Sequence, residues 1–275
     1  MNFFKNKLQI FITVVFLAYF VWWLSFQSSL TDQGPSTQWF GSTYGVMALI
    51  ASLIGFIASR KWGGFKTVLG KALLFISIAL FLQEAGQLIY AYYIYVGNIQ
   101  IPYPSWGDVA YYGSALSYVV GAFFLAKSVS FGTLFKASKF KFVPFIVPII
   151  MLGISSFFFL YNHQYDFSNT LTVFLDFGYP ITEAVYVSLA LIAYLSSSKL
   201  LGGLMKSALL IMMFGFVVQY AADFSFLYAS SRDSYLAGNG VDLTFLVAYF
   251  VAATAMIRFL ATYNNLKQKT SGKVT

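Results

Sequence analysis

Long apolar runs alternate with short polar segments along the whole chain, and the runs are about 20 residues long. A helix needs about this length to cross a hydrocarbon layer of ~30 Å. The pattern predicts an all-α, polytopic membrane helical bundle with about eight transmembrane helices in one membrane domain, residues 1–275. The predicted spans are approximately 8–29, 38–59, 69–96, 106–126, 142–161, 170–196, 205–229 and 241–261.

Composition supports a membrane protein. Apolar residues make up 59% of the chain and charged residues only 9%, whereas about a quarter of the residues in a typical soluble domain are charged. The chain is therefore expected to fold inside a bilayer rather than in water.

Charged residues divide between the two sides of this predicted topology. Short cytoplasmic loops carry an excess of Lys and Arg, and an N-terminus inside puts every basic residue except Arg232 on the cytoplasmic side. The same topology puts all 9 Asp and Glu residues in the outer half. We therefore expect a multi-pass protein of the cell membrane with both termini cytoplasmic and a short basic tail at about 262–275.

The formal net charge of +8 is better explained by membrane lipids than by nucleic acid as a partner. The basic residues lie in short loops beside helix ends, and they lack the interleaved aromatic residues of a nucleic-acid surface. Contact with anionic lipid is the expected role.

Polar residues repeat at matching spacing in the two halves of the chain. The third and seventh predicted spans each carry polar or aromatic residues spaced four and then three apart, and each is followed by an Asp that begins the next span. This pattern predicts two parallel four-helix repeats, at about 8–126 and 142–261. The paired residues are Gln83 with Gln219, Gln87 with Asp223, Tyr90 with Phe226, and Asp108 with Asp242.

Several chemistries are disfavoured by what the sequence lacks. There is no cysteine and a single histidine, His163, so thiolate metal sites, HExxH metalloprotease sites and bis-histidine haem sites are excluded. No nucleophile elbow, triad or phosphate-binding loop is present. We expect no metal site, no cofactor and no enzyme activity.

Ionisable residues inside predicted spans mark the candidate site, because charge at membrane depth is costly and usually faces a cavity or a partner. Four residues of the sixth span are spaced three, four and three apart and share one helical face. With residues of the third and seventh spans they could form an outward-open pocket for a cationic small molecule or for protons. The candidate ligand-binding residues are Gln83, Glu84, Gln87, Tyr90, Asp176, Tyr179, Glu183, Tyr186, Gln219 and Asp223.

Each candidate also has a structural interpretation. Asp108 and Asp242 begin helices, where a carboxylate caps free backbone N–H groups, and they would alternatively lie at the pocket mouth. Glu84 and Glu183 could be protonated and hydrogen-bonded simply to join neighbouring helices.

Two segments resemble a known group of proteins. The run from Pro102 to Tyr111 reads PYPSWGDVAY, and the run from Asp176 to Glu183 reads DFGYPITE; Asp223 and the Gly240-Val241-Asp242 run follow. Together these segments resemble the N-terminal multi-span membrane sensor region of bacterial GGDEF-type diguanylate cyclases and related signalling proteins. The resemblance implies a bundle that senses a ligand or the state of the membrane. No output domain follows the last span, so a cytoplasmic signalling partner is expected.

Three functions remain open. The first is a sensor- or receptor-like protein with an outward-facing acidic and aromatic intramembrane pocket. The alternative is a proton- or cation-coupled small-molecule transporter, because repeats and midplane carboxylates also occur in carriers. The second alternative is a structural or assembly protein, and small residues in the spans would also suit a homo-oligomer. Polar residues stop at about mid-depth, which favours reception over translocation.

Overall fold

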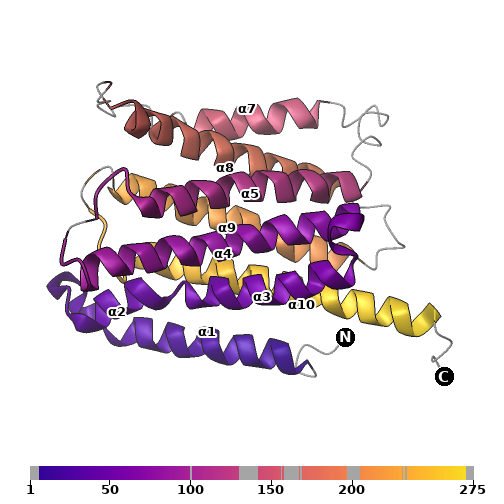
Figure 1. Ribbon diagram of the computed structural model, residues 1–275, viewed down its shortest axis with the longest axis horizontal. Helices are drawn as coiled ribbons and strands as arrows, with labels where there is room; N and C mark the ends of the chain where they lie inside the picture. Colours follow the sequence, from indigo (N-terminus) through magenta and orange to yellow (C-terminus); the bar gives the residue numbers. More distant parts are fainter. Residues whose placement is uncertain are drawn as a thin grey trace.

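A computed structural model describes residues 6–99, 101–129, 142–155, 157, 167, 169–196, 205–230, 232 and 234–270. Within these ranges the chain is helical and contains no strand, as predicted (Figure 1). The helices are α1 (Lys7–Ser25), η2 (Gln27–Asp32), α2 (Pro35–Thr43), α3 (Val46–Lys61), η3 (Gly64–Lys66), α4 (Val68–Tyr95), α5 (Trp106–Ser128), α7 (Val143–Ser155), α8 (Thr170–Ser196), α9 (Lys206–Ser230) and α10 (Gly240–Thr270).

Seven helical segments of the described chain are long and apolar enough to cross a membrane, which confirms a multi-pass helical membrane protein. Helices α2 and α3 form one of these segments, Pro35–Lys61, although Tyr44 and Gly45 separate them. The predicted fifth span, 142–161, is described only as far as the 13-residue helix α7. Apart from Phe142 and Phe157, its remaining residues, like His163, lie outside the described part of the chain.

Helix starts follow from local sequence. The Asn6 side chain accepts a hydrogen bond from the backbone N–H of Leu8 at the start of α1, and Thr67 accepts one from Gly70 at the start of α4. Ser105 and Asp108 form a capping box at the start of α5. These side chains satisfy backbone donors that have no partner within the first helical turn.

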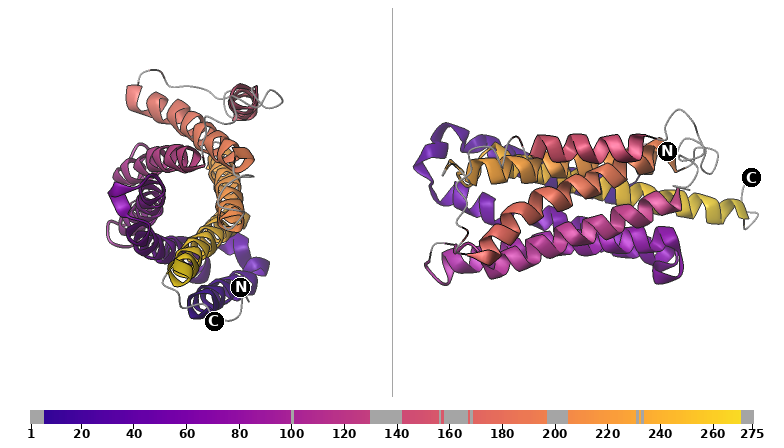
Figure 2. Two further views of the ribbon diagram at one scale, coloured as in Figure 1. Left: turned by 90° about the vertical axis from the view of Figure 1, so that its right-hand side faces the viewer. Right: turned by 90° about the horizontal axis from the view of Figure 1, so that it is seen from above.

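Six helices form a closed ring. Helix α3 packs on α4, α4 on α5, α5 on α8, α8 on α9, α9 on α10, and α10 returns to α3. Helix α1 lies outside the ring against α10, and α7 lies outside it against α8 (Figure 2). Residues on the inner faces of six helices from both halves of the chain therefore meet along one axis.

The order of helices around the ring is compatible with the predicted repeats. An exchange of the two halves would match α1 with α7, α3 with α8, α4 with α9 and α5 with α10, and the ring order is preserved by that exchange. The arrangement does not test whether the two halves superimpose. The repeat remains a prediction.

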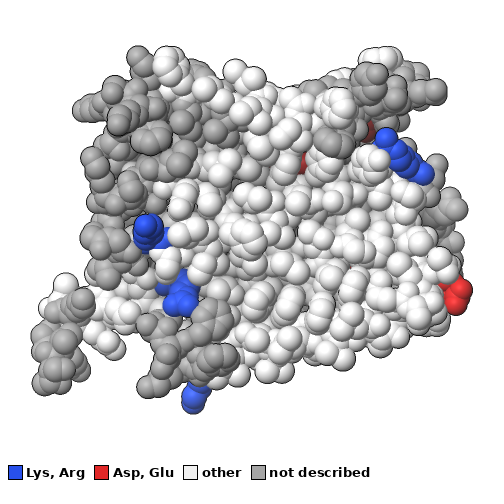
Figure 3. Space-filling model, turned by 180° about the vertical axis from the view of Figure 1, so that it is seen from behind, with Lys and Arg blue, Asp and Glu red and all other residues white. Residues whose placement is uncertain are grey.

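The described charges lie toward opposite ends of the bundle. Helices α1 and α4 begin, and α3, α5 and α10 end, at what we call the basic end, which carries Lys7, Lys61, Lys66, Lys127 and Lys267. The opposite end, called the acidic end, carries Asp32, Asp108 and Asp242 at or near helix termini. Figure 3 shows several Lys and Arg side chains toward one end of the visible face, and acidic side chains with one further basic group toward the other.

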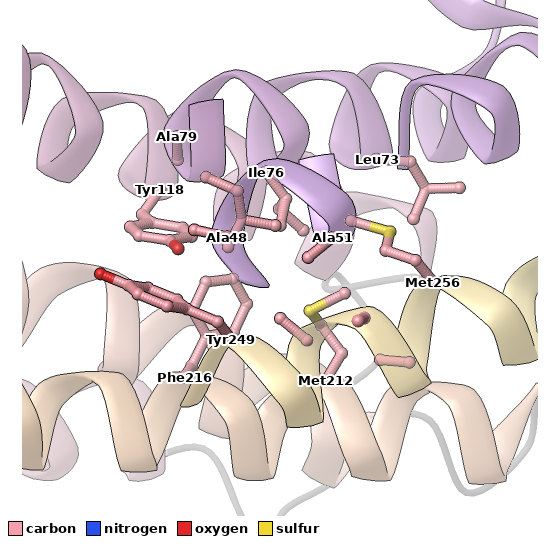
Figure 4. Packing of buried hydrophobic residues seen from close by; sticks show 14 of the residues in the cluster. Ala48, Ala51, Leu73, Ile76, Ala79, Tyr118, Met212, Phe216, Tyr249 and Met256 are labelled. Atoms are coloured by element: carbon pink, nitrogen blue, oxygen red, sulfur yellow. The ribbon is translucent and has the colours of Figure 1, made fainter. Parts of the chain in front are cut away.

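The ring interior toward the basic end is filled by apolar side chains. Met47, Leu73, Ile76, Met212 and Met256 are each at most 1% exposed. Figure 4 shows Leu73, Ile76, Met212 and Met256 packed among alanines from the neighbouring helices. Since lipid is as apolar as these side chains, close packing rather than exclusion from water holds such helices together.

Helices α4 and α5 pack closely at Gly121. A Cβ atom built at Gly121 would lie 2.7 Å from Ile76 Cγ1 and 3.1 Å from the Ile76 backbone nitrogen. At Gly113 in the same helix, the nearest neighbour would be Leu82 Cδ1 at 3.4 Å, an ordinary van der Waals distance. The small residues of α5 thus serve packing within the chain.

We expect Gly121→Ala to lower the thermal unfolding temperature of the detergent-purified protein, because overpacking of this kind costs about 1–3 kcal/mol. Gly113→Ala is the matched control, since it adds the same methyl group to the same helix without a close neighbour. Equal unfolding temperatures for the two variants would contradict the close contact between α4 and α5.

Candidate functional site

Most of the candidate residues fall into four groups of contacts, all in the half of the bundle toward the acidic end, and Asp176 and Asp242 make separate contacts with tyrosines. One group lies in the ring interior around Gln83. A second joins α8 to α9, a third surrounds the start of α5, and a fourth lies between α4 and the junction of α2 with α3. The structure therefore brings some of the predicted residues together and separates others.

Gln83 joins three helices in the ring interior. Its Nε2 donates to Ser114 Oγ on α5 at 3.1 Å, and its Oε1 accepts from the Tyr249 hydroxyl on α10 at 3.1 Å. Gln83, Ser114 and Tyr249 are all buried. Both polar atoms of this amide therefore link α4 to a neighbouring helix.

The second group, which we call the acidic pair, consists of Glu183 on α8 and Asp223 on α9. Asp223 Oδ2 accepts from the Tyr186 hydroxyl at 3.1 Å, and Asp223 Oδ1 accepts from Gln219 Nε2 at 3.0 Å. Glu183 lies close enough to Asp223 for the two carboxylates to interact electrostatically. Glu183 is 3% exposed, and its Oε2 has no hydrogen-bond partner within the described chain.

Aromatic rings line the side of the acidic pair that faces the ring interior. The Tyr186 ring centroid lies 5.4 Å from that of Tyr118 on α5 and 5.6 Å from that of Phe216 on α9. Figure 4 shows Tyr118, Phe216 and Tyr249 lying together at the edge of the apolar packing. The rings of Tyr118, Tyr186 and Phe216 thus bound the acidic pair on the side toward the basic end.

The third group surrounds Asp108 at the start of α5. Asp108 Oδ2 accepts from the Ser105 backbone N–H and hydroxyl, both at 2.7 Å. Asp108 Oδ1 accepts from the hydroxyls of Tyr90 at 3.3 Å and Tyr179 at 3.4 Å. The carboxylate therefore caps α5 and also joins that helix to α4 and α8.

Asp176 and Asp242 also bind tyrosines. Asp176 Oδ1 accepts from the Tyr103 hydroxyl at 2.7 Å. Asp242 is fully buried, and it accepts from the Tyr235 hydroxyl at 2.8 Å and from the Gly238 backbone N–H at 2.7 Å, in the turn before α10. Burial, with the Asp242 charge adding to it, raises the pKa of Tyr235, so this phenol remains a donor at neutral pH.

Glu84 and Gln87 face the junction between α2 and α3. Gln87 Nε2 donates to the Gly41 carbonyl, and Gln87 Oε1 accepts from the Tyr111 hydroxyl at 3.2 Å. A Cβ atom at Gly45 would collide with Glu84 Oε2, an oxygen without a hydrogen-bond partner in the described residues. Glu84 therefore belongs to a contact different from that of Glu183.

Several residues of these groups were not predicted from the sequence. Tyr111, Ser114 and Tyr118 are spaced three and four apart on one face of α5, the same spacing that marked the stripe in α8. This spacing could have identified them. Ser105 lies three residues before Asp108, the spacing of a capping box, so local sequence could also have identified it. Tyr235 and Tyr249 carry no comparable signal in the sequence.

Fold and spans define the class of this chain as a multi-pass helical membrane protein. Comparison with protein-family models, curated proteins and solved structures finds no match. In the described chain, no three or more His, Cys, Asp or Glu residues are placed to hold a metal ion. Evidence for the function of this chain therefore comes from the contacts of the candidate residues.

We expect Tyr249→Phe to destabilise the protein by about 0.6–1 kcal/mol, the usual contribution of a hydrogen bond between membrane helices. The substitution removes only the hydroxyl that donates a hydrogen bond to Gln83 Oε1. Tyr92→Phe is the control, because Tyr92 is 59% exposed near the end of α4. Chemical or thermal unfolding of both variants in detergent is the measurement, and an unchanged stability for Tyr249→Phe would show that the Gln83 link is absent.

Proposed function

We propose that this chain is a receptor-like protein of the cell membrane that takes up a proton or a cationic small molecule at the acidic pair. The observation that carries the proposal is the buried Glu183 oxygen without a hydrogen-bond partner beside Asp223. A ligand that donates a hydrogen bond or a positive charge would complete the site.

Electrostatics support a cationic ligand. Two carboxylates in a water-poor interior cannot both stay ionised without a neutralising cation or proton. Asp223 already accepts two donors, from Tyr186 and Gln219, whereas Glu183 Oε2 accepts none. The unfilled acceptor therefore lies on the α8 side of the pair.

The packing of the ring supports reception over transport. A carrier needs polar groups or an openable path on both sides of its site. Toward the basic end, the interior below Tyr118 and Phe216 holds Met212, Met256 and Leu73, all buried and apolar. Polar contacts are concentrated in the other half, which suits a site approached from one side.

Charge distribution supports an orientation in which the basic end and both termini are cytoplasmic, because short cytoplasmic loops are rich in Lys and Arg. In this orientation the acidic pair is reached from outside the cell. A cytoplasmic signalling partner would then bind at the basic end. The resemblance to sensor regions of GGDEF-type diguanylate cyclases agrees with this proposal. It identifies no ligand-binding contact.

We expect Glu183→Gln and Asp223→Asn to abolish stabilisation of the purified protein by its cationic ligand. The measurement is thermal unfolding from pH 4 to pH 9 with a panel of inorganic cations and organic amines. A ligand at about 100 times its Kd stabilises a folded protein by about 2.7 kcal/mol. If protons are the ligand, the wild type becomes more stable as the pH falls, because the folded state then binds more protons than the unfolded state.

Two variants serve as controls. Glu84→Gln removes the other buried carboxylate with an unpartnered oxygen, and Asp32→Asn removes an exposed charge at the acidic end. Both are expected to keep the ligand effect. Its loss in Glu84→Gln but not in Glu183→Gln would move the site to the α2–α3 junction, and no effect in the wild type would favour carboxylates that only join helices. Uptake of the stabilising cation into proteoliposomes would favour the transporter.

A further inference from the structure

A groove of about 630 Å³ opens at the basic end, between the start of α1, the end of α3 and the last part of α10. It lies far along the bundle from the acidic pair. Its polar lining consists of Asn6, Lys7, Lys61, Asn264 and Asn265. Its volume is within the range of about 300–1,000 Å³ that holds organic ligands.

The groove results from the way α1 packs. Near its start, α1 rests on α10, where Gln9 Nε2 donates to Thr254 Oγ1 at 3.2 Å and Ile12 is fully buried. Near its end, α1 is held to α2 by the hydrogen bond from Trp22 Nε1 to Ser36 Oγ at 2.8 Å. The groove lies beyond the Gln9 contact toward the basic end, where the first turn of α1, the last turn of α3 and α10 together line an open space.

The lining combines positive charge with apolar surface. Lys7 and Lys61 provide two cations, the three asparagines provide amide donors, and no carboxylate is among the lining residues. The apolar part consists of Leu8, Ile57, Ile257, Leu260 and Ala261. Leu8 and Ile57 are 43% and 54% exposed, so a ligand there can cover apolar surface as well as meet charge.

The groove also lies at the level where a bilayer changes from polar to apolar. Lys7 begins one membrane-spanning segment and Lys61 ends another. Leu8 and Ile57 lie one residue and four residues further into those segments. Phospholipid headgroups and the first part of their acyl chains occupy this level in a membrane.

We propose that this groove binds an anionic phospholipid from the leaflet at the basic end, with the phosphate at Lys7 and Lys61 and an acyl chain against Ile57, Leu260 and Leu8. Charge complementarity favours an anionic headgroup over a zwitterionic one, because no acidic side chain in the lining can pair with a choline or ethanolamine group. The apolar floor favours a lipid over a free anion, which would leave that surface uncovered. The site is independent of the acidic pair and of the function proposed for it.

Native mass spectrometry of the full chain in detergent, titrated with phosphatidylglycerol, tests the site. Lys7→Gln with Lys61→Gln is expected to weaken binding about 25-fold, the product of about fivefold for each lysine near an anionic headgroup. Both lysines are exposed, so the double variant is expected to fold. Lys66→Gln with Lys127→Gln is the matched control, because it removes two exposed charges at the same end outside the groove.

A third variant tests the apolar floor. Ala261→Phe fills part of the groove while both lysines remain, and it is expected to weaken phosphatidylglycerol binding without changing the charge. Phosphatidylcholine and inorganic phosphate are expected to bind the wild type at least tenfold more weakly than phosphatidylglycerol. Equal binding by the two double variants, or by phosphatidylcholine and phosphatidylglycerol, would overturn the site. Phosphate binding that Ala261→Phe leaves unchanged would show that the lysines hold a free anion instead.

Discussion

Polar side chains buried inside an apolar bundle must find their partners within the protein, because hydrocarbon offers none. This constraint organises the half of the molecule toward the acidic end. Gln83 links α4, α5 and α10, Asp223 accepts donors from α8 and α9, and Asp108 joins α5 to α4 and α8. Five of the six ring helices are thereby tied together by hydrogen bonds. In the other half of the ring, close apolar packing is joined by buried hydrogen bonds from Ser52 Oγ to the Ser77 carbonyl and from Ser59 Oγ to the Gly70 carbonyl, between α3 and α4.

Apolar run length and charge predicted the helices well because both depend on local sequence. The spans match the described helices to within four residues, with two exceptions. Helix α10 continues to Thr270, nine residues past the predicted end at 261 and into the predicted tail, and part of 142–161 lies outside the described chain. The separation of α2 from α3 at Tyr44 and Gly45 was not predicted. Only the structure shows that Gly45 makes room for the Glu84 carboxylate.

Helical periodicity predicted the α8 stripe, but it could not predict which neighbour each residue meets. Gln83 and Glu84 are adjacent in sequence and about 100° apart around α4. Gln83 therefore faces α5 and α10, while Glu84 faces Gly45. Whether two polar residues share a site depends on how six helices close into a ring, and this is a property of the whole chain.

The two carboxylates that keep an unpartnered oxygen differ in their surroundings. Glu84 Oε2 lies against a glycine of the α2–α3 junction, where close contact alone limits what else can enter. Glu183 lies beside a second carboxylate, so electrostatic repulsion adds a reason for a cation or proton to bind. The acidic pair is the stronger candidate site because two independent effects favour a ligand there: the unpartnered oxygen of Glu183 and its repulsion by Asp223.

Helix α9 gives the acidic pair a physical connection to the basic end. Met212, Phe216, Gln219 and Asp223 are spaced four, three and four apart, so they lie on one face of that helix. The polar part of this face carries Asp223 of the acidic pair, and its apolar part packs in the closely filled half of the ring. Since packed interiors shift between discrete arrangements rather than deform freely, a ligand that altered the Asp223 contacts would act on Phe216 and Met212 through the same rigid element. On the proposed function, this face of α9 is the shortest route by which occupancy of the acidic pair could change the surface at the basic end.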